Sequence, residues 1–499
     1  MSATHTRRVD GVEVHHLDAD GPLTADLLFR VGVVDETVST LGLSHLVEHL
    51  ALDGVEGLEP DVDGESAMTY TVLRVRGTPE RVADRLERIC ARLSALAAGG
   101  VSDAELAHAR RVLEAEGGGP MADGPHAAEH LHHRLGAAGF GLGVVPARFL
   151  ARITPAEVAD WAGTRFTAGN ALLVLSGPAP ETLRLPLPVG ARRPLPETPF
   201  LARPYPAEFL SGGEEPSVSF VLDDVHDTSP AALVLLVSAL RARVFRTLRQ
   251  ERGIVYDVAV DAAVLGRHGL LTVVVRCAEK DAVPAVQGVL EILRGLRDGG
   301  AHDHERQRAA QEYEADEAGA AAVDRHLHDH QSRFLGHPPM EGVDARAVQT
   351  VPDAEIARLL SRLEDTLLVG FPPAGREEGQ LLGAEALMFP HVEVDDGPVV
   401  AGEEFRPGWA ARMGGFRLRC TVGAEGIGLD FVDGSLGIRW DDVVAWSLGR
   451  DEHRTEVLTL EARDGSGGDI PLSLFKNAER LRSLVLAHLP ERLRLPEEG

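Results

Sequence analysis

Cysteine is nearly missing from the sequence. Only Cys90, Cys277 and Cys420 occur among its 499 residues. They are far apart along the chain and odd in number, which argues against a disulfide framework and against a cysteine zinc site. We therefore expect reduced thiols packed in the core. Any metal site in this chain must use histidine and carboxylate ligands.

Basic residues are scarce relative to acidic ones. The chain has 50 Lys and Arg against 77 Asp and Glu, a formal net charge of −27 at pH 7. Nucleic acids and anionic membrane surfaces need clustered positive charge, so we expect neither as a partner. Basic peptides, such as basic leader segments, would be attracted. An acidic surface that only maintains solubility explains the charge equally well.

Long apolar runs are also missing. No stretch approaches the roughly 20 apolar residues that span a bilayer, so we expect no membrane span. The N-terminal stretch, residues 1–22, holds two arginines but no apolar core and no cleavage-like site, which is unlike a signal peptide. We therefore expect the protein to remain in the cytoplasm.

Hydrophobic periodicity predicts an α+β unit in the first part of the chain. We expect strands at 24–33, 67–77 and 171–178, and helices at 41–52, 80–100, 102–116 and 154–166. The capping-box pair Ser102 and Glu105 begins the third of these helices and places Glu116 near its far end. A proline-rich stretch without sustained period follows, which is typical of an interdomain linker.

After this linker the same order of elements returns. We expect strands at 217–224, 253–264 and 269–279, and helices at 229–250, 281–300 and 302–319. We interpret the repeat as two duplicated α+β domains, visible in element order rather than in residue identity.

From about residue 410 the pattern changes to short alternating strands with turns. One helix at 478–489 closes this part, with Asn477 as its predicted N-cap. The arrangement resembles a pleckstrin-homology-type domain. Because its arginines, Arg417, Arg419 and Arg439, are scattered among acids, protein contact or dimerisation is a better-fitting role than lipid binding. We place the domains at 1–185, 207–395 and 410–499, with the linker at 186–206.

The stretch "GLSHLVEHLAL", residues 42–52, contains a His-x-x-Glu-His motif. On a helix, His45 and His49 project from one face, one turn apart, and can reach one ion. A hydrolytic zinc site has three protein ligands and a water molecule, and an adjacent carboxylate can accept the proton of that water. The motif therefore predicts Zn²⁺ bound by His45 and His49, with Glu48 as the general base. The alternative is a solvated helix face that is rich in histidine.

The surroundings of this motif resemble the pitrilysin/insulinase family of zinc peptidases, in particular its mitochondrial processing peptidase-like branch. "RRVLEAE" is similar to the family's later helix with the third zinc ligand, and the resemblance implies Glu116 for that role. Glu114 is the second choice. Ala109 stands where family members often have a supporting glutamate, which implies weaker support of the metal.

"LRQERGIVY" resembles the family's second-domain motif, in which an arginine and a tyrosine contact the substrate backbone opposite the zinc. The resemblance implies that role for Arg249 and Tyr256, because donors placed at the developing negative charge lower the barrier of peptide hydrolysis. Taken alone, the pair fits an arginine at a helix end and a tyrosine packed on a strand.

Two further groups of histidines, at 126–133 and 326–330, have no supporting pattern, and we expect solvated helix faces there. The sequence thus predicts a zinc endopeptidase that cleaves peptides or unfolded leader segments held between two domains. It could work as a homodimer or with a related subunit. The alternatives are an inactive scaffold or partner subunit, and a metal-binding module without hydrolysis.

Overall fold

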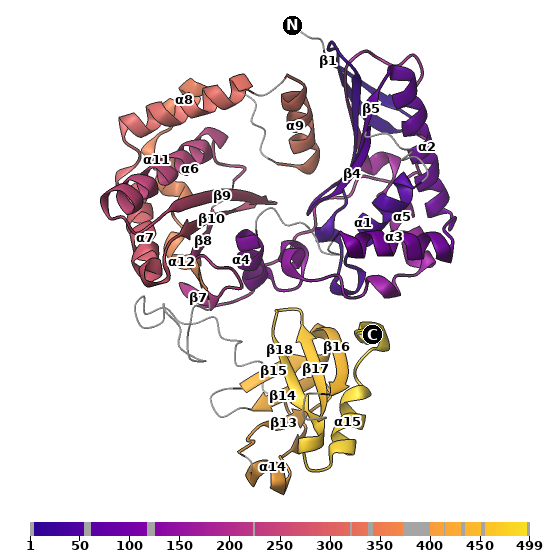
Figure 1. The fold of residues 1–499 in the computed structure, drawn as a ribbon, viewed down its shortest axis with the longest axis vertical. Helices are drawn as coiled ribbons and strands as arrows, with labels where there is room; N and C mark the ends of the chain where they lie inside the picture. The colour runs from indigo at the N-terminus through magenta and orange to yellow at the C-terminus, as the bar shows by residue number, and fades with distance from the viewer. Residues whose placement is uncertain are drawn as a thin grey trace.

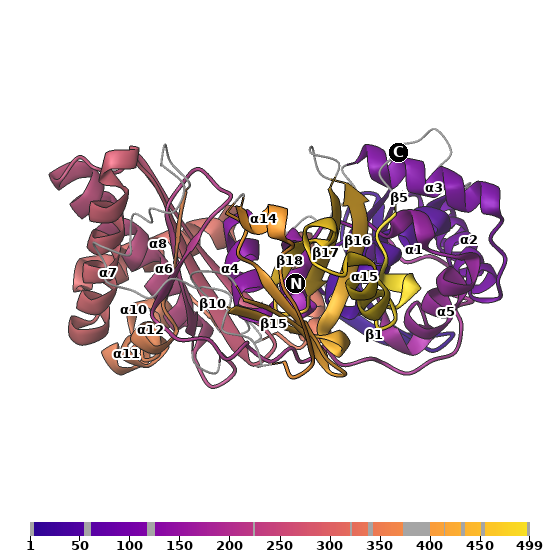
Figure 2. The ribbon, with the colours of Figure 1, turned by 90° about the horizontal axis from the view of Figure 1, so that it is seen from below.

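The computed structural model of the protein describes residues 4–53, 61–116, 125–222, 225–319, 322–337, 343–372, 400–413, 415–430, 435–450 and 455–496. The predicted domain end at 395 lies outside these residues. Two halves, each a mixed β-sheet covered by helices, lie side by side, and a third, β-rich unit lies below them in Figure 1 and in front of them in the view from below (Figure 2). The predicted α+β fold is confirmed.

The first half is built on a six-stranded sheet with the order β1-β2-β6-β3-β5-β4. The strands are β1 (Thr4–Val9), β2 (Val12–Leu17), β3 (Leu23–Phe29), β4 (Val62–Ser66), β5 (Thr71–Gly77) and β6 (Ala171–Ser176). Only β2 and β6 pair in parallel. One face packs on the helices α1 (Leu43–Leu52), α2 (Pro79–Ala97), α3 (Asp103–Ala115) and α5 (Pro155–Arg165) in one apolar core.

The hairpin β1–β2 was not among the predicted strands, the first of which begins at residue 24. Its strands pair in register across a two-residue turn, Asp10 and Gly11, whose φ angles are 49° and 91°. Such positive φ values are typical of tight hairpin turns and favour Asp and Gly. The residue types Asp and Gly therefore indicate a turn, but the segment "THTRRV" lacks the alternation of apolar and polar residues that would predict a strand.

The second half repeats the order of the first sheet without β1: β7-β11-β8-β10-β9. Its strands are β7 (Ala207–Leu210), β8 (Ser217–Leu222), β9 (Asp257–Leu265), β10 (His268–Arg276) and β11 (Leu368–Phe371). The parallel pair β7–β11 stands in the place of β2–β6. The helices α6 (Pro230–Val244), α7 (Ala282–Gly299) and α8 (Asp303–Gly319) belong to this half. In the two sheets, β4 and β9 are the corresponding edge strands.

The two halves exchange one helix each. Helix α4 (Pro125–Leu135), from the first half of the chain, packs Leu131 and Leu135 against Val221 and Leu270 of the second sheet. Helix α9 (Ala322–Leu335), from the second half, packs Phe334 and Leu335 on the free face of the first sheet. Each half therefore completes the core of the other, and the sheets are held together by apolar packing.

The expectation of solvated histidines is wrong for two of them. His130 on α4 is fully buried between Ser217 Oγ at 2.9 Å and Ser219 Oγ at 2.8 Å. His326 on α9 is 8 % exposed. Burial follows from the helix exchange, which a periodic pattern cannot reveal. The side chain of His126 lies outside the described residues.

The third unit holds a four-stranded sheet, β12-β13-β14-β15, and a three-stranded sheet, β16-β17-β18. The strands are β12 (Glu403–Phe405), β13 (Arg419–Val422), β14 (Gly426–Asp430), β15 (Ser435–Arg439), β16 (Val443–Arg450), β17 (Glu456–Ala462) and β18 (Gly467–Pro471), and helix α15 (Ala478–Leu486) follows. Asn477 is the N-cap residue of this helix, as predicted, with φ 63° and without a side-chain hydrogen bond to the first turn.

The third unit is docked on the first half. Arg148 donates two hydrogen bonds to the Glu461 carboxylate, and the amide of Ala137 donates to the carbonyl of Arg463 at 2.6 Å.

As predicted, Cys90 and Cys420 are buried free thiols, while Cys277 is half-buried. Among the described helices, none is long and apolar enough to cross a bilayer.

Candidate metal centre

Helix α1 positions the two histidines of the His-x-x-Glu-His motif. Its apolar face, which includes Leu46, Val47 and Leu50, is buried in the core of the first half. The chain enters the helix through Gly42 at φ 91°, a left-handed conformation that favours glycine. The opposite face presents His45 and His49, which the core packing holds in one orientation.

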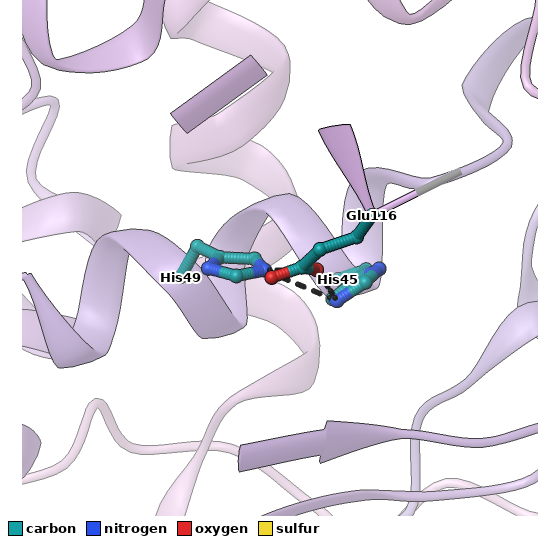
Figure 3. A group of neighbouring side chains, drawn as sticks. All are labelled: His45, His49 and Glu116. Atoms are coloured by element: carbon teal, nitrogen blue, oxygen red, sulfur yellow. Dashed lines mark hydrogen bonds and ion pairs between the residues drawn. The ribbon is translucent and has the colours of Figure 1, made fainter. Parts of the chain in front are cut away.

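Three side chains converge on one point beside this helix (Figure 3). The Nε2 atoms of His45 and His49 are 3.1 Å apart. Glu116 Oε2 lies 3.2 Å from His49 Nε2 and 3.4 Å from His45 Nε2. Among the described residues, these three form the one group of His, Cys, Asp or Glu side chains arranged to hold a metal ion.

These distances fit a zinc ion. Zinc–ligand bonds are about 2.0–2.1 Å long and tetrahedral, so two ligand atoms of one site lie about 3.3 Å apart. The three observed separations, 3.1, 3.2 and 3.4 Å, are close to that value. Two imidazoles and one carboxylate also match the ligand set of hydrolytic zinc sites.

Burial keeps His45 in the form that a metal requires. Burial, and next the charge of His49, lower the pKa of His45 to about 4, against an opposing effect of Glu116. His45 is therefore a neutral imidazole at pH 7, and a neutral ring nitrogen is the ligand atom.

Glu48 lies beside the metal ligands without joining them. Its side chain is buried, and its Oε2 atom is 3.7 Å from His45 Nε2. Ser66 Oγ, at the end of β4, donates a hydrogen bond to the same oxygen at 3.0 Å. The edge strand β4 approaches so closely that a Cβ atom on Gly64 would stand 2.2 Å from Glu48 Oε1. The carboxylate is thus fixed between α1 and β4.

Helix α3 brings in the third ligand. The Ser102–Glu105 capping box is present as predicted, and Glu116 occupies the C-cap position. The structure brings Glu116, and not the second choice Glu114, to the histidines.

Ala109, where the family often has a supporting glutamate, is buried in the core. Instead, hydrogen bonds of Arg92 on helix α2 connect α3 to α1. Arg92 donates to Glu105 at 2.7 Å and to the carbonyl of Leu50 at 3.1 Å. The arginine thereby fixes the helix of the glutamate ligand relative to the helix of the histidines.

Sequence reasoning missed Glu36, which holds the start of α1. Its carboxylate accepts hydrogen bonds from the amides of Gly42 at 2.8 Å and Ser44 at 2.7 Å. The first amides of a helix lack partners within the helix, so Glu36 acts as a cap from six residues upstream. The buried Arg30–Asp35 ion pair lies next to it in the chain. No short capping motif signals this contact, because the loop must fold back first.

We expect Glu36→Ala to weaken zinc binding as well as the fold. The buried amide of Ser44 and the partly buried amide of Gly42 lose their acceptor, which costs about 1–3 kcal/mol of unfolding free energy. Displacement of the α1 N-terminus lowers zinc affinity by about 10- to 100-fold, as loss of support for a ligand generally does. Denaturant unfolding and chelator competition measure the two effects. Glu157→Ala is the matched control, since Glu157 caps α5 in the same half but that helix holds no ligand.

The raised pKa of Glu36 leads to a second prediction, on how stability depends on pH. Burial raises its pKa to about 7, against the lowering effect of the Ser44 and Gly42 hydrogen bonds, whereas the ordinary value is 4.5. Between these pH values the folded chain keeps a proton that the unfolded chain has released. The unfolding free energy of the metal-free protein therefore falls as pH rises from 4.5 to 7, and this contribution disappears in Glu36→Gln. Identical pH slopes in the two proteins would contradict it.

The structure places Arg249 and Tyr256 on the other half of the molecule. Arg249 lies in a π-helical turn, η6 (Phe245–Glu251), with its guanidinium 4.8 Å from the centre of the Phe245 ring. Tyr256 stands just before the edge strand β9 and is 63 % exposed. Among the described side chains, no hydrogen bond joins this pair to the metal ligands. Hydrogen bonds among the described side chains thus do not connect the two parts of the predicted site within one chain.

Comparison with known proteins supports the fold. Residues 216–313 match the family model described as "Peptidase M16 inactive domain". These residues include Arg249 and Tyr256 and exclude all three metal ligands. Among curated proteins, none is similar enough in sequence to match.

Several solved structures have a similar fold. The peptidase M16 inactive domain from Pseudomonas fluorescens is 15 % identical, with a TM-score of 0.56 over 74 % of this chain and 98 % of that one. The first half of the periplasmic protease PqqL from Escherichia coli is 12 % identical, with a TM-score of 0.56 over 74 % and 91 %. Pitrilysin is 14 % identical, with a TM-score of 0.60 over 76 % of this chain and 46 % of its own. The chain therefore has an α+β fold that resembles M16 peptidase domains.

Proposed function

We propose that this protein is a zinc-dependent endopeptidase that cleaves peptides or unfolded segments held between its two halves. The observation that carries the proposal is the convergence of His45, His49 and Glu116 at zinc-ligand separations, with Glu48 buried beside them. A solvated helix face would not bring in a carboxylate from a second helix. The family model describes an inactive domain, but it covers only residues of the second half.

His45, His49 and Glu116 would hold Zn²⁺. A bound zinc ion supplies Lewis-acid chemistry, polarising the scissile carbonyl and making water more acidic. Glu48 accepts the proton of the attacking water and passes it to the leaving amine. Ser66 and the packing of β4 keep its carboxylate in place for both transfers.

The edge strand β4 supports binding of an extended peptide. It pairs with β5 on one side, and no other described strand pairs with its second side. An open edge offers amides and carbonyls to a substrate strand. Because β4 touches Glu48 through Ser66 and Gly64, a peptide added to this edge lies beside the catalytic carboxylate. Arg249 and Tyr256 would contact the substrate from the second half, after a closing movement or from a partner chain.

We expect Gly64→Ala to lower activity while zinc stays bound. The added methyl group cannot fit 2.2 Å from Glu48 Oε1, so the carboxylate or β4 must move. A displacement of about 1 Å can cost about 100-fold in rate. Peptide cleavage and zinc content are measured on the same preparation. Gly163→Ala is the control, because its Cβ meets only an ordinary 3.5 Å contact; equal activity of both variants would contradict the assignment.

The finer sequence-based assignments belong to the same proposal. The shared strand order supports two duplicated domains, and the two sheets with a closing helix support a pleckstrin-homology-like third unit. The processing peptidase-like branch, the cytoplasmic location, the pairing into homodimers or heterodimers and the preference for basic leader peptides stay predictions. A catalytically inactive partner subunit is the second candidate, and the description of the matching family model as an inactive domain favours it.

One experiment separates these functions. Zinc content is measured on the purified full chain, and a peptide library is followed for cleavage by mass spectrometry. One zinc per chain with cleavage supports the peptidase. If the chain binds zinc but cleaves no peptide, either alone or after related subunits have been added, the metal-binding scaffold is the function that remains.

A further inference from the structure

Two cavities continue from the end of the edge strand β4. The first, of about 790 Å³, lies between the halves and is lined by residues 67–70, which directly follow Ser66, and by parts of α4, β9 and α9. The second, of about 940 Å³, shares Phe140, Leu265 and Leu335 with the first. The first cavity therefore begins where the strand beside Glu48 ends, and the second cavity adjoins the first through these three residues.

The second cavity is positively charged, although the chain has a net charge of −27. Its lining holds four arginines and a single carboxylate, that of Glu197. Arg30 is neutralised by an ion pair with Asp35. Arg192 and Arg193 come from the proline-rich segment between the halves, and neither forms an ion pair among the described residues. Arg192 and Arg193 thus bring two guanidinium groups without an ion-pair partner among the described residues to the wall of this cavity.

The two arginines are held at the cavity by their neighbours. The Arg192 guanidinium lies 4.5 Å from the centre of the Phe334 ring and donates to the carbonyl of Phe334. The amide of Arg193 donates to Asn170 Oδ1 at 2.9 Å, which leaves its side chain exposed.

We propose that this second cavity binds a carboxylate of the peptide substrate, either an acidic side chain or the C-terminal carboxylate. Guanidinium groups bind carboxylates in a planar, two-bond geometry, which makes them suited to this ligand. The first cavity, lined by Met68, Leu131 and Leu270, accepts apolar residues between the cleaved bond and this carboxylate. The substrate class is thus a peptide with an apolar stretch followed by an acid, an assignment that rests on the proposed peptidase function.

This assignment opposes the basic leader peptide that net charge predicted. Charges in solution act over about 8 Å at physiological ionic strength, so the groups lining a cavity decide its preference more than the total charge does. The carboxylates of β4 do not favour a basic peptide either, because Asp63 and Glu65 already pair with Arg74 at 3.6 and 2.5 Å.

The test uses the zinc-loaded full chain with Glu48→Gln, so that peptides bind without being cut. Fluorescent peptides of one apolar sequence end in Glu, Gln or Lys, each with a free or an amidated C-terminus. We expect the acidic peptides to bind at least about tenfold more tightly than the neutral ones, which equals about 1.4 kcal/mol. Added salt should reduce this ratio. The amidated series shows whether the side chain or the terminus is bound.

Variants of the cavity complete the test. Adding Arg193→Gln, alone and with Arg192→Gln, should bring the acidic-to-neutral ratio close to one, with zinc content unchanged. Arg7→Gln, an exposed arginine on β1, should keep the ratio. An equal or stronger affinity for the Lys peptides, or a ratio that survives both cavity variants, would overturn the proposal. Cleavage of the neutral peptide by the wild-type chain reports the peptidase function separately, so either idea can fail alone.

Discussion

Glu48→Gln should bind one zinc ion per chain and cleave peptides at least about 100-fold more slowly than the wild-type chain. A positioned general base contributes about 10²- to 10⁴-fold to a proton transfer. The amide of glutamine keeps the size and the Ser66 hydrogen bond but cannot accept the proton from water. Because Glu48 does not belong to the metal group, zinc content should not change.

The measurement is the rate of peptide cleavage at saturating zinc, with metal analysis of the same samples. Glu114→Gln, a carboxylate on α3 outside the metal group, is the matched control and should retain activity. If Glu48→Gln and wild type cut at the same rate, Glu48 is not the base. If the variant loses zinc, Glu48 supports the metal rather than the proton transfer.

His49→Ala should lose the metal itself. Its Nε2 atom lies close to both other ligand atoms, at 3.1 Å from His45 Nε2 and 3.2 Å from Glu116 Oε2. Loss of an indirect support already costs about 10- to 100-fold in metal affinity, so loss of a ligand should exceed 100-fold. We expect no bound zinc after dialysis at micromolar protein and no cleavage.

His108→Ala controls for the removal of an imidazole, since His108 is exposed on α3 outside the metal group. Zinc retention by His49→Ala would contradict the assigned ligand set. Restoration of activity at high zinc would fit it, because the site would then be weakened but still usable.

Much of the metal centre could be predicted because its signals are local. Four-residue spacing places His45 and His49 on one helix face, and the Ser102 capping box fixes where α3 begins and hence where Glu116 lies. For the same reason hydrophobic periodicity predicted β3, β5, β6 and the helices α1, α2, α3 and α5 of the first half, but not the hairpin β1–β2 or the edge strand β4. The ligand choice between Glu114 and Glu116 needed the family resemblance as well.

The rest depends on contacts between distant segments. Glu36 reaches α1 only after the loop 33–41 has folded, and Arg92 joins two helices through a backbone carbonyl. His130 is buried because α4 crosses to the second sheet, although its own sequence looks like a polar helix face. The second cavity is lined by Arg192 and Arg193, and the negative net charge of the whole chain gives no sign of this local positive charge. None of these features has a sequence period or a motif.

The most direct measurement is a zinc titration of metal-free wild-type chain while peptide cleavage is followed. The account predicts no cleavage without zinc, a rate that rises until one zinc per chain has been added, and a plateau beyond. Cleavage by the metal-free protein, or no cleavage of any peptide with one zinc bound at His45, His49 and Glu116, would contradict it.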